Sequence, residues 1–515
     1  MSEIRKLNHH IPEWNYLEEY HCYLLERVLY CERPSVPSQQ CMNIFVPDVY
    51  LNEDGTVRGD GGLNGFDASS VPVIFENGLA GYMEAEPFGI EDPRSAAKDF
   101  LQAGFVYVSC GCRGRSSVDE KQKRCGKSPA SLVDLKAGIR FLKHHRGVIP
   151  GNMDRIVSVG ISAGGAMSTL LGTTGNSRNY EVELAAIGAV MTETDDIFAA
   201  QCYCPIIDLE HADMAYEWMF QGKTHYDGML FVGFPEGDLT PFCQALSGGL
   251  GRAYISYLNG LKLVHPETGE AVEIGEGHTG SGSEYLLRKL EASAAKFLGK
   301  LERGELPLAC SASDYINGTY VEQKFHPWKK CMTEIPGLDK SSWLSWDGQK
   351  AKIAGIEAMQ ENYLRRLKLC PAFDDLNLIQ AENQEFGTPE NDRVHFNSDL
   401  IRILEELAVQ FPEETAKYLP EYQKMTGDEE LDRRKYLLNP MNYIGTEEEA
   451  DMAPHFRIRV GSRDADTSAT ITMTLALALK QTGKTDVDYE IVWDEPHGRA
   501  DYPGEVTAWV KEICQ

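Results

Sequence analysis

Short apolar runs alternate with amphipathic segments through the first part of the chain. Val71–Phe75 and Phe105–Ser109 are rich in β-branched and aromatic residues and predict buried strands. Residues 92–103 between them have helical character, and a longer helix is predicted from Ser128-Pro129 onward, with one apolar face formed by Leu132, Leu135, Ile139 and Leu142. Further strands are predicted at 41–50 and 198–204. Because strands and helices alternate, we expect an α/β fold with a mostly parallel sheet covered by helices on both faces.

The alternation stops between Asp208 and Ala450, where acidic residues and helical patterns prevail. Apolar spacing predicts helices at Ser281–Arg303, Ile353–Leu369 and Ser398–Phe411. A connection of this length must have structure of its own. Residues 208–450 are therefore predicted to form a mainly helical insertion, and its charge clusters to be solvated, as at 428–430 and 447–449.

Strand character returns near the end of the chain, at His455–Val460 and at Val487–Trp493. A strong helix is predicted between these strands at Ser468–Gln481, and a short one follows at Gly504–Cys514. The sheet domain is therefore predicted to be discontinuous. It would consist of residues 1–207 and 451–515, with the insertion, residues 208–450, placed over it as a lid.

The segment Arg155–Met167 joins a β-branched run to small residues that open a helix, through Gly160-Ile-Ser-Ala-Gly164. Gly-x-Ser-x-Gly in this context is typical of a tight strand-to-helix turn that exposes a serine hydroxyl at the edge of a sheet. Glycines are needed because strand and helix pass too close for a Cβ atom. We therefore predict that Ser162 is a nucleophile; the alternative is a purely structural turn.

A serine hydroxyl needs a general base, and the base needs a carboxylate that orients it. In sheets that carry such a turn, the acid and then the histidine follow the serine along the chain. His497 lies in a Pro- and Gly-flanked loop after the last predicted strand and is the predicted base. Asp464, at the exit of the preceding strand, is the predicted acid, ahead of Asp466 and Asp494.

The negative charge on an attacked carbonyl oxygen needs two N–H donors. The amide of Ala163, directly after the serine, is the first predicted donor, and Gly78 in the loop 76–81 is the second. This loop and the one at 110–115 both follow predicted strands, so we expect them at the same sheet edge. The second loop carries two arginines that are expected to form structural ion pairs rather than to contact a substrate, Arg113 and Arg115.

The net charge and the spacing of the cysteines limit the classes of binding partner that are expected. The 515 residues carry a formal net charge of −28, which argues against nucleic acid, since phosphate contacts need clustered Lys and Arg. The 13 cysteines show no zinc-site spacing, and Cys110, Cys112, Cys202 and Cys204 are expected to be buried free thiols.

Residues 1–10 lack the apolar core of a signal peptide, and no stretch is long enough to span a bilayer. A cytoplasmic protein without membrane contact is therefore expected. The composition favours neither a monomer nor a homodimer.

Motifs along nearly the whole chain resemble those of the bacterial tannases, at 109–115, 134–143, 160–167, 212–218, 463–467 and 493–497. These enzymes are α/β-hydrolases of the tannase and feruloyl esterase group that cleave galloyl esters. The resemblance implies an α/β-hydrolase fold, and the family's triad would fall on Ser162, Asp464 and His497. It calls for no metal and no cofactor.

The resemblance also implies how an acyl group is recognised. The family binds the three phenolic hydroxyls of a galloyl ring with a lysine, a glutamate and a second aspartate, which by motif correspond to Lys368, Glu382 and Asp466. Carboxylates accept hydrogen bonds from such hydroxyls, and a lysine donates to a phenolic oxygen. The expected function is a serine carboxylesterase acting on small aromatic esters, with galloyl esters favoured. The alternatives are a feruloyl-type or general carboxylesterase, a serine peptidase of the same fold, or a catalytically silent binding protein.

Overall fold

The computed structural model describes residues 5–6, 14–228, 235–326, 331–446 and 450–515. Within these ranges a ten-stranded sheet has the order β1-β3-β4-β8-β7-β9-β10-β17-β18, with β2 paired to β3. The strands are β1 (Arg5–Lys6), β2 (Asn15–Leu17), β3 (Cys22–Leu29), β4 (Cys41–Pro47), β7 (Pro72–Asn77), β8 (Val106–Cys110), β9 (Asn152–Ile161), β10 (Ala199–Tyr203), β17 (His455–Gly461) and β18 (Asp486–Val492). From β8 to β18 all neighbours are parallel, whereas β3, β4 and β8 pair antiparallel. The predicted mostly parallel sheet is confirmed.

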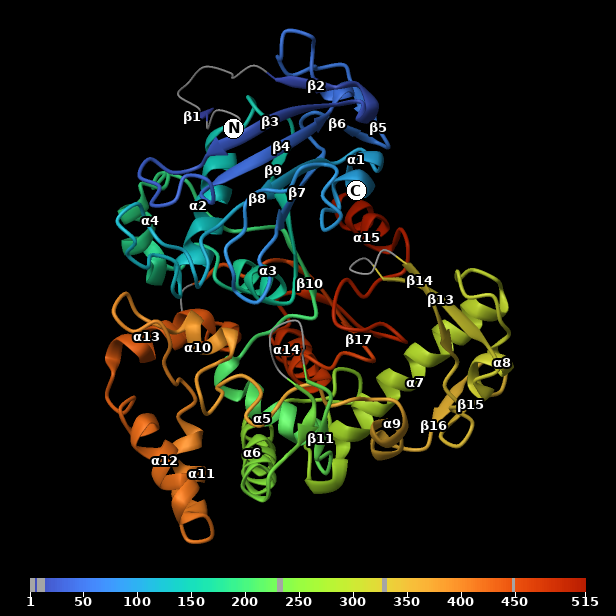
Figure 1. The fold of residues 1–515 in the computed structure, drawn as a ribbon. Helices are drawn as coiled ribbons and strands as arrows, with labels where there is room; N and C mark the ends of the chain where they lie inside the picture. Colours follow the sequence, from blue (N-terminus) through green and yellow to red (C-terminus); the bar gives the residue numbers. More distant parts are fainter. Residues whose placement is uncertain (1–4, 7–13, 229–234, 327–330, 447–449) are drawn as a thin grey trace.

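Helices cover both faces of this sheet. They are α1 (Ala97–Gln102), α2 (Ala130–His144), α3 (Ala163–Thr173), α4 (Glu181–Ile187), α14 (Ala469–Gln481) and α15 (Glu505–Cys514). Figure 1 shows α2 and α4 on one side and α1 and α15 on the other. The predicted apolar face of α2 is buried along its length. Helix α1 begins later than predicted, because the Asp92 carboxylate accepts the Arg94 amide (2.9 Å) and closes a turn there.

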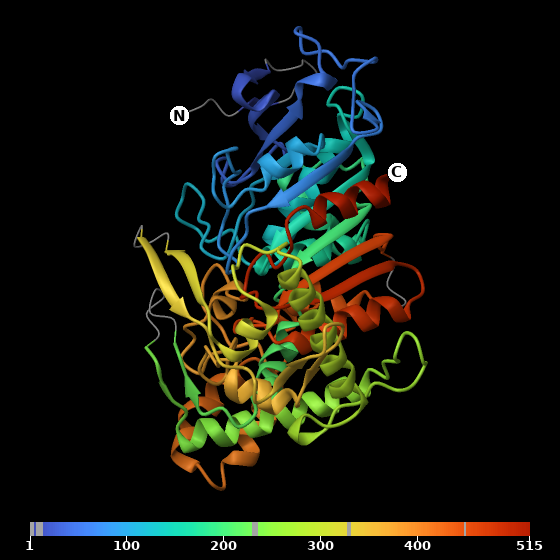
Figure 2. The ribbon, with the colours of Figure 1, turned by 90° about the vertical axis from the view of Figure 1, so that its right-hand side faces the viewer.

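The segment between β10 and β17 holds further helices and strands, which gather on one side of the sheet in both views (Figures 1 and 2). Its helices are α5 (Leu209–Met219), α6 (Pro241–Gly260), α7 (Ser281–Glu302), α8 (Ala312–Asn317), α9 (Ile356–Asn362), α10 (Ala381–Glu385), α11 (Asp399–Leu407), α12 (Pro412–Gln423) and α13 (Glu429–Leu438). It also contains three antiparallel pairs, β11 (His225–Tyr226) with β12 (Gly237–Asp238), β13 (Val321–His326) with β14 (Cys331–Pro336), and β15 (Leu344–Trp346) with β16 (Ala351–Ile353). The segment is mainly helical, as predicted. Its treatment as a domain with boundaries at 208 and 450 stays a prediction.

The predicted helix at 353–369 is wrong in its second half, because α9 ends at Asn362. Beyond it, the guanidinium of Arg366 donates to both carboxylate oxygens of Glu217 (2.6 and 2.7 Å). The amides of Leu367 and Lys368 donate to the hydroxyl of Tyr216 at 3.1 Å. Backbone donors that a helix would use are thus paired with α5, an arrangement that apolar spacing cannot reveal.

The charge cluster at 428–430 is exposed, as predicted, whereas 447–449 and most of residues 1–10 lie outside the described residues. None of the helices in the described ranges is both long enough and apolar enough to cross a bilayer.

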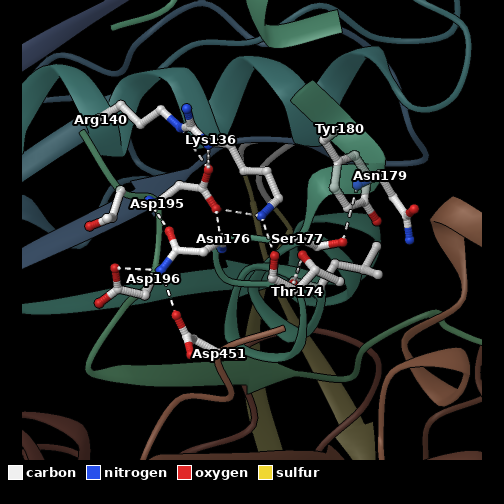
Figure 3. A network of polar contacts seen from close by, with 12 residues as sticks. Lys136, Arg140, Thr174, Asn176, Ser177, Asn179, Tyr180, Asp195, Asp196 and Asp451 are labelled. Atoms are coloured by element: carbon white, nitrogen blue, oxygen red, sulfur yellow. Dashed lines mark hydrogen bonds and ion pairs between the residues drawn. The ribbon is translucent and has the colours of Figure 1, made fainter. Parts of the chain in front are cut away.

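A buried polar network ties α2 to the loop that follows α4 (Figure 3). Asp195 accepts from Lys136 (2.7 Å) and the Asn176 backbone amide (2.9 Å) through one oxygen, and from two nitrogens of Arg140 (2.6 and 2.7 Å) through the other. The Asn176 side chain donates to Asp451 (2.6 Å), at the point where the chain returns to the sheet. All four lone-pair directions of a carboxylate and two buried cations are thus matched in one cluster.

Replacing Asp195 by Asn should lower the free energy of unfolding by about 3–5 kcal/mol, because Lys136 and Arg140 would remain buried without a counter-charge. Urea unfolding measures the loss. The matched control is Asp154→Asn, which breaks a bidentate pair with Arg146 (2.7 Å) on the surface. That change should cost less than about 1 kcal/mol. Equal losses in the two variants would contradict the role given to burial.

Candidate active site

Ser162 lies at a sharp turn between β9 and α3. Its backbone has φ 61° and ψ −122°, a left-handed region that residues with a Cβ rarely adopt. A Cβ on Gly160 would stand 2.0 Å from the Gly164 carbonyl oxygen, so the first glycine of the motif is required by contact. Strain of this kind is typical of functional sites, and the observed turn is the one that the Gly-x-Ser-x-Gly spacing predicts.

His497 lies on the loop after β18, and its Nδ1 is 2.8 Å from Asp464 Oδ2. The other carboxylate oxygen of Asp464 accepts the amides of Asp466 and Thr467, each at 2.9 Å. Burial lowers the pKa of the imidazole, but the Asp464 charge outweighs it and holds that pKa well above its ordinary value. The pair is therefore a half-buried imidazole against a buried carboxylate, and the acid is oriented by its own loop.

The other two acids weighed as partners point elsewhere. Asp494 accepts from the hydroxyl of Tyr363 (2.9 Å) and from Arg463 (3.2 Å). Asp466 faces the ammonium of Lys368 at 3.9 Å. Of the three candidate acids, Asp464 is thus the one hydrogen-bonded to the imidazole.

Partly buried ion pairs anchor the loop that carries the imidazole. Arg499 donates to Glu76 at the end of β7 (2.6 Å). Asp501 accepts from Arg457 on β17 (2.7 and 2.9 Å) and from the hydroxyl of Tyr203 on β10 (2.7 Å). Three strands of the sheet therefore hold this loop in place on the edge where Ser162 lies.

The two amides predicted to bind an oxyanion lie on segments that hydrogen bonds hold together, and their role stays a prediction. The amide of Gly164 donates to Leu79 (3.1 Å), and the Asn77 side chain donates to the Gly164 carbonyl (3.1 Å), so the loop after β7 is bound to the start of α3. The Ala163 and Gly78 amides donate to no backbone or side-chain acceptor within the described residues. A Cβ on Gly78 would meet the Phe88 ring at 2.4 Å, so a close approach requires glycine there.

Lys368, Glu382 and Asp466 converge although they are far apart in the sequence. The Lys368 ammonium lies over the Phe373 ring, 3.9 Å from its centroid, and faces Asp466. Glu382 is buried, and its burial raises the pKa of its carboxyl although the charges of Lys368 and Arg115 oppose the shift. The three groups therefore form one cluster of a cation and two acids, in which Lys368 and Glu382 are buried and Asp466 is partly exposed.

Tyr216 of α5 joins this cluster to the loop of Asp464. Its hydroxyl donates to the carbonyl of Ala465 (3.0 Å) and accepts the amides of Leu367 and Lys368 (3.1 Å each). Ala465 stands between Asp464, which faces the imidazole, and Asp466, which faces the lysine. One short loop thus serves both groups of residues.

A second buried network supports the cluster from behind. Asp213 accepts the Phe373 amide (2.7 Å), and Asp374 accepts the side-chain amide of Asn383 (2.7 Å), the residue after Glu382. Burial and the nearby Asp374 raise the pKa of Asp213 to about 7. Buried carboxylates therefore hold the residues next to the cluster in place. The sequence analysis did not identify these carboxylates. Asp213 lies within the tannase-like motif 212–218, which was the available signal.

Three expectations about side chains outside the cluster can be compared with the structure. Arg113 forms a buried bidentate ion pair with Asp134 (2.8 and 2.9 Å), as expected. Arg115 instead donates to the Gly81 carbonyl (2.8 Å) and to the Gln384 side chain, and its charge faces Glu382. Cys204 is buried, as predicted, but its sulfur lies 3.9 Å from Nε2 of His497, a contact that the strand pattern gave no reason to expect.

Comparison with known proteins places these features in context. The BD-FAE family model matches residues 78–231, which include Ser162 and the loop after β7. A search of curated proteins finds no match. Among solved structures, native tannin acyl hydrolase from Lactobacillus plantarum is similar, with 30% sequence identity and a TM-score of 0.76 over 96% of this chain and 94% of that chain.

Two further structures agree. Fusobacterium nucleatum tannase has 29% identity and a TM-score of 0.76, with 96% of this chain and 95% of that chain covered. A tannin acyl hydrolase in complex with ethyl gallate has 30% identity and a TM-score of 0.77, with 98% and 97% covered. The fold is an α/β-hydrolase fold with a mainly helical insertion, as expected from the sequence. The chain therefore belongs to the tannase family and is a carboxylic ester hydrolase.

Proposed function

We propose that this protein hydrolyses esters of hydroxylated aromatic acids, with galloyl esters preferred, through a Ser162–His497–Asp464 triad. The observation that carries the proposal is the loop 464–466. One of its acids is hydrogen-bonded to the imidazole at 2.8 Å, and the other faces the buried Lys368. The acid that orients the imidazole and the acid proposed to bind the ring are thus separated by only two peptide bonds.

In the first step Ser162 Oγ attacks the ester carbonyl carbon while His497 Nε2 takes the hydroxyl proton. Asp464 stabilises the imidazolium through Nδ1. The amides of Ala163 and Gly78 donate to the oxyanion of the tetrahedral intermediate. Collapse of this intermediate breaks the ester C–O bond, and the imidazolium protonates the departing alcohol.

In the second step a water molecule gives a proton to His497 and attacks the acyl-enzyme. The second tetrahedral intermediate then releases the aromatic acid and restores the Ser162 hydroxyl. Each proton that leaves an attacking oxygen returns to a departing one, so the cycle consumes one water molecule and needs no cofactor.

Recognition of the acyl group falls to Lys368, Glu382 and Asp466. The two carboxylates accept hydrogen bonds from ring hydroxyls, and the ammonium donates to the oxygen of the remaining hydroxyl. A buried site built for such hydroxyls disfavours rings without them, since its polar groups would be left unpaired. The family resemblance and the complex of a related enzyme with ethyl gallate support a galloyl group.

A feruloyl-type esterase is the second candidate, favoured by the match of the BD-FAE model to residues 78–231. The two candidates share the triad and differ in the ring. Rates for methyl gallate and methyl ferulate on one preparation distinguish them.

Ser162→Ala should lower kcat by about 10⁴-fold or more, because it removes the nucleophile, with the melting temperature little changed. Ser313→Ala, on α8 in the insertion, is the control and should keep the native rate. Activity that survives in the first variant, measured with methyl gallate, would refute the assignment.

Lys368→Ala should lower kcat/KM for methyl gallate by about 10- to 100-fold, the equivalent of one or two lost hydrogen bonds to a charged group. Methyl benzoate, which lacks ring hydroxyls, should be hydrolysed at nearly the same rate by both forms. Lys352→Ala, on an exposed lysine, serves as the matched control. If methyl gallate is not preferred to methyl ferulate and Lys368→Ala changes neither, the galloyl preference is wrong.

The acids of one loop should separate chemistry from recognition. Asp464→Asn should reduce kcat for methyl gallate and methyl benzoate alike, by about 10⁴-fold, because the imidazole loses its orienting carboxylate. Asp466→Asn should reduce kcat/KM for methyl gallate about tenfold and leave methyl benzoate nearly unchanged. Steady-state kinetics on the four enzyme–substrate pairs test this; the reverse pattern would exchange the two roles.

A further inference from the structure

Cys204 lies beside the reaction centre, and the proposed mechanism does not use it. It follows β10 with φ 35°, in the left-handed region, and is fully buried. Its thiol donates to the Gly498 carbonyl (3.3 Å) and lies 3.9 Å from His497 Nε2. The residue before it, Tyr203, accepts the backbone N–H of Ser162 through its carbonyl oxygen (3.0 Å). A soft ligand thus faces the one nitrogen that must receive the serine proton.

We propose that Cys204 and His497 form an inhibitory zinc site, in which Zn²⁺ bridges Sγ and Nε2 and removes the base from catalysis. Within the described residues, Cys204, Asp464 and His497 are the group of potential ligands whose atoms lie within 4.8 Å of one another. A thiolate and an imidazole are the side chains that zinc and the related soft ions prefer. Magnesium and calcium, which take oxygen ligands, are not expected to bind.

The separation of the two atoms suits a bridging ion. Zinc bonds measure about 2.3 Å to a thiolate sulfur and about 2.0–2.1 Å to an imidazole nitrogen. Their sum exceeds the 3.9 Å between Sγ and Nε2, so an ion can bond to both atoms in a bent arrangement. Two coordination positions then remain for water or for the Ser162 hydroxyl.

The partner of the imidazole also suits a zinc ligand. A histidine that binds zinc through one nitrogen usually donates its other N–H to a carboxylate, which fixes the ring. His497 makes this bond to Asp464 at 2.8 Å, and the carboxylate is held by two amides of its own loop. The triad therefore already supplies the outer-shell support of a zinc site.

The protons and electron pairs of the zinc-binding step balance. The Cys204 thiol releases its proton to solvent, and so does Nε2 where the imidazole is protonated; the thiolate sulfur and the neutral Nε2 then each donate a lone pair to Zn²⁺, with no change of oxidation state. Because Nε2 is then occupied, it cannot accept the serine proton. The inhibitory effect rests on the proposed function, whereas the binding itself rests on the geometry alone.

Zinc titration of methyl gallate hydrolysis tests the inhibition. The native enzyme should be inhibited and should recover on addition of EDTA. Cys204→Ala should need at least tenfold more zinc for half-inhibition of its own zinc-free rate, because loss of outer-shell groups alone already costs about 10- to 100-fold in affinity. Cys125→Ala and Cys310→Ala, which remove less buried thiols, should keep the native sensitivity. Equal inhibition of native enzyme and Cys204→Ala would overturn the proposal.

Direct binding with Co²⁺ as the probe keeps the test independent of turnover. The native enzyme should gain thiolate-to-cobalt absorption at one ion per chain, and Zn²⁺ should displace it. Cys204→Ala, or Cys204→Ser if the first variant does not fold, should lack the band. If Ser162→Ala retains activity but the band depends on Cys204, the proposed function fails and the metal site stands. If the band is absent or survives in the variant, the metal site fails.

Discussion

The parallel pairing of β10 with β17 is the interaction on which the site depends. It aligns Cys202 with Ile458, and at its end the Cys204 amide donates to the Arg459 carbonyl (2.6 Å). Parallel strands end at the same edge of a sheet, so this ladder brings the loops after β17 and β18 to the edge where β9 exposes Ser162. The whole insertion lies between these two neighbouring strands, and the ladder forms although the chain makes that long excursion.

Buried charged groups within the insertion fix those of its segments that contribute to the candidate site. Arg366 and Glu217 form a two-fold ion pair with both side chains fully buried. A pair of this kind is costly to desolvate and contributes more to a unique geometry than to stability. Here it fixes the irregular segment after α9, which holds Lys368. The carboxylates of Asp213 and Asp374 have a similar effect on the residues beside it.

The close packing of the candidate site also places Cys204 where the proposed metal ion would bind. The tight turn at Ser162 and the left-handed backbone at Cys204 place a thiol against Nε2 of His497, the proposed base. An esterase needs a neutral, accessible imidazole nitrogen, and so does a zinc ion. The two demands meet at Nε2.

The sequence by itself determined the features that depend on near neighbours. Gly160-Ile-Ser-Ala-Gly164 specifies its turn because contacts within five residues exclude a Cβ, and the strands around it are read from period and β-branching. The choice of Ser162, Asp464 and His497 followed from the order in which nucleophile, acid and base occur along chains with this kind of turn, and from the motif resemblance. Only the tertiary structure decided which oxygen of Asp464 faces the imidazole, where α9 ends, and that Cys204 contacts Nε2. These depend on hydrogen bonds and packing between residues that are 33 to 293 positions apart, and local propensity carries no information about such contacts.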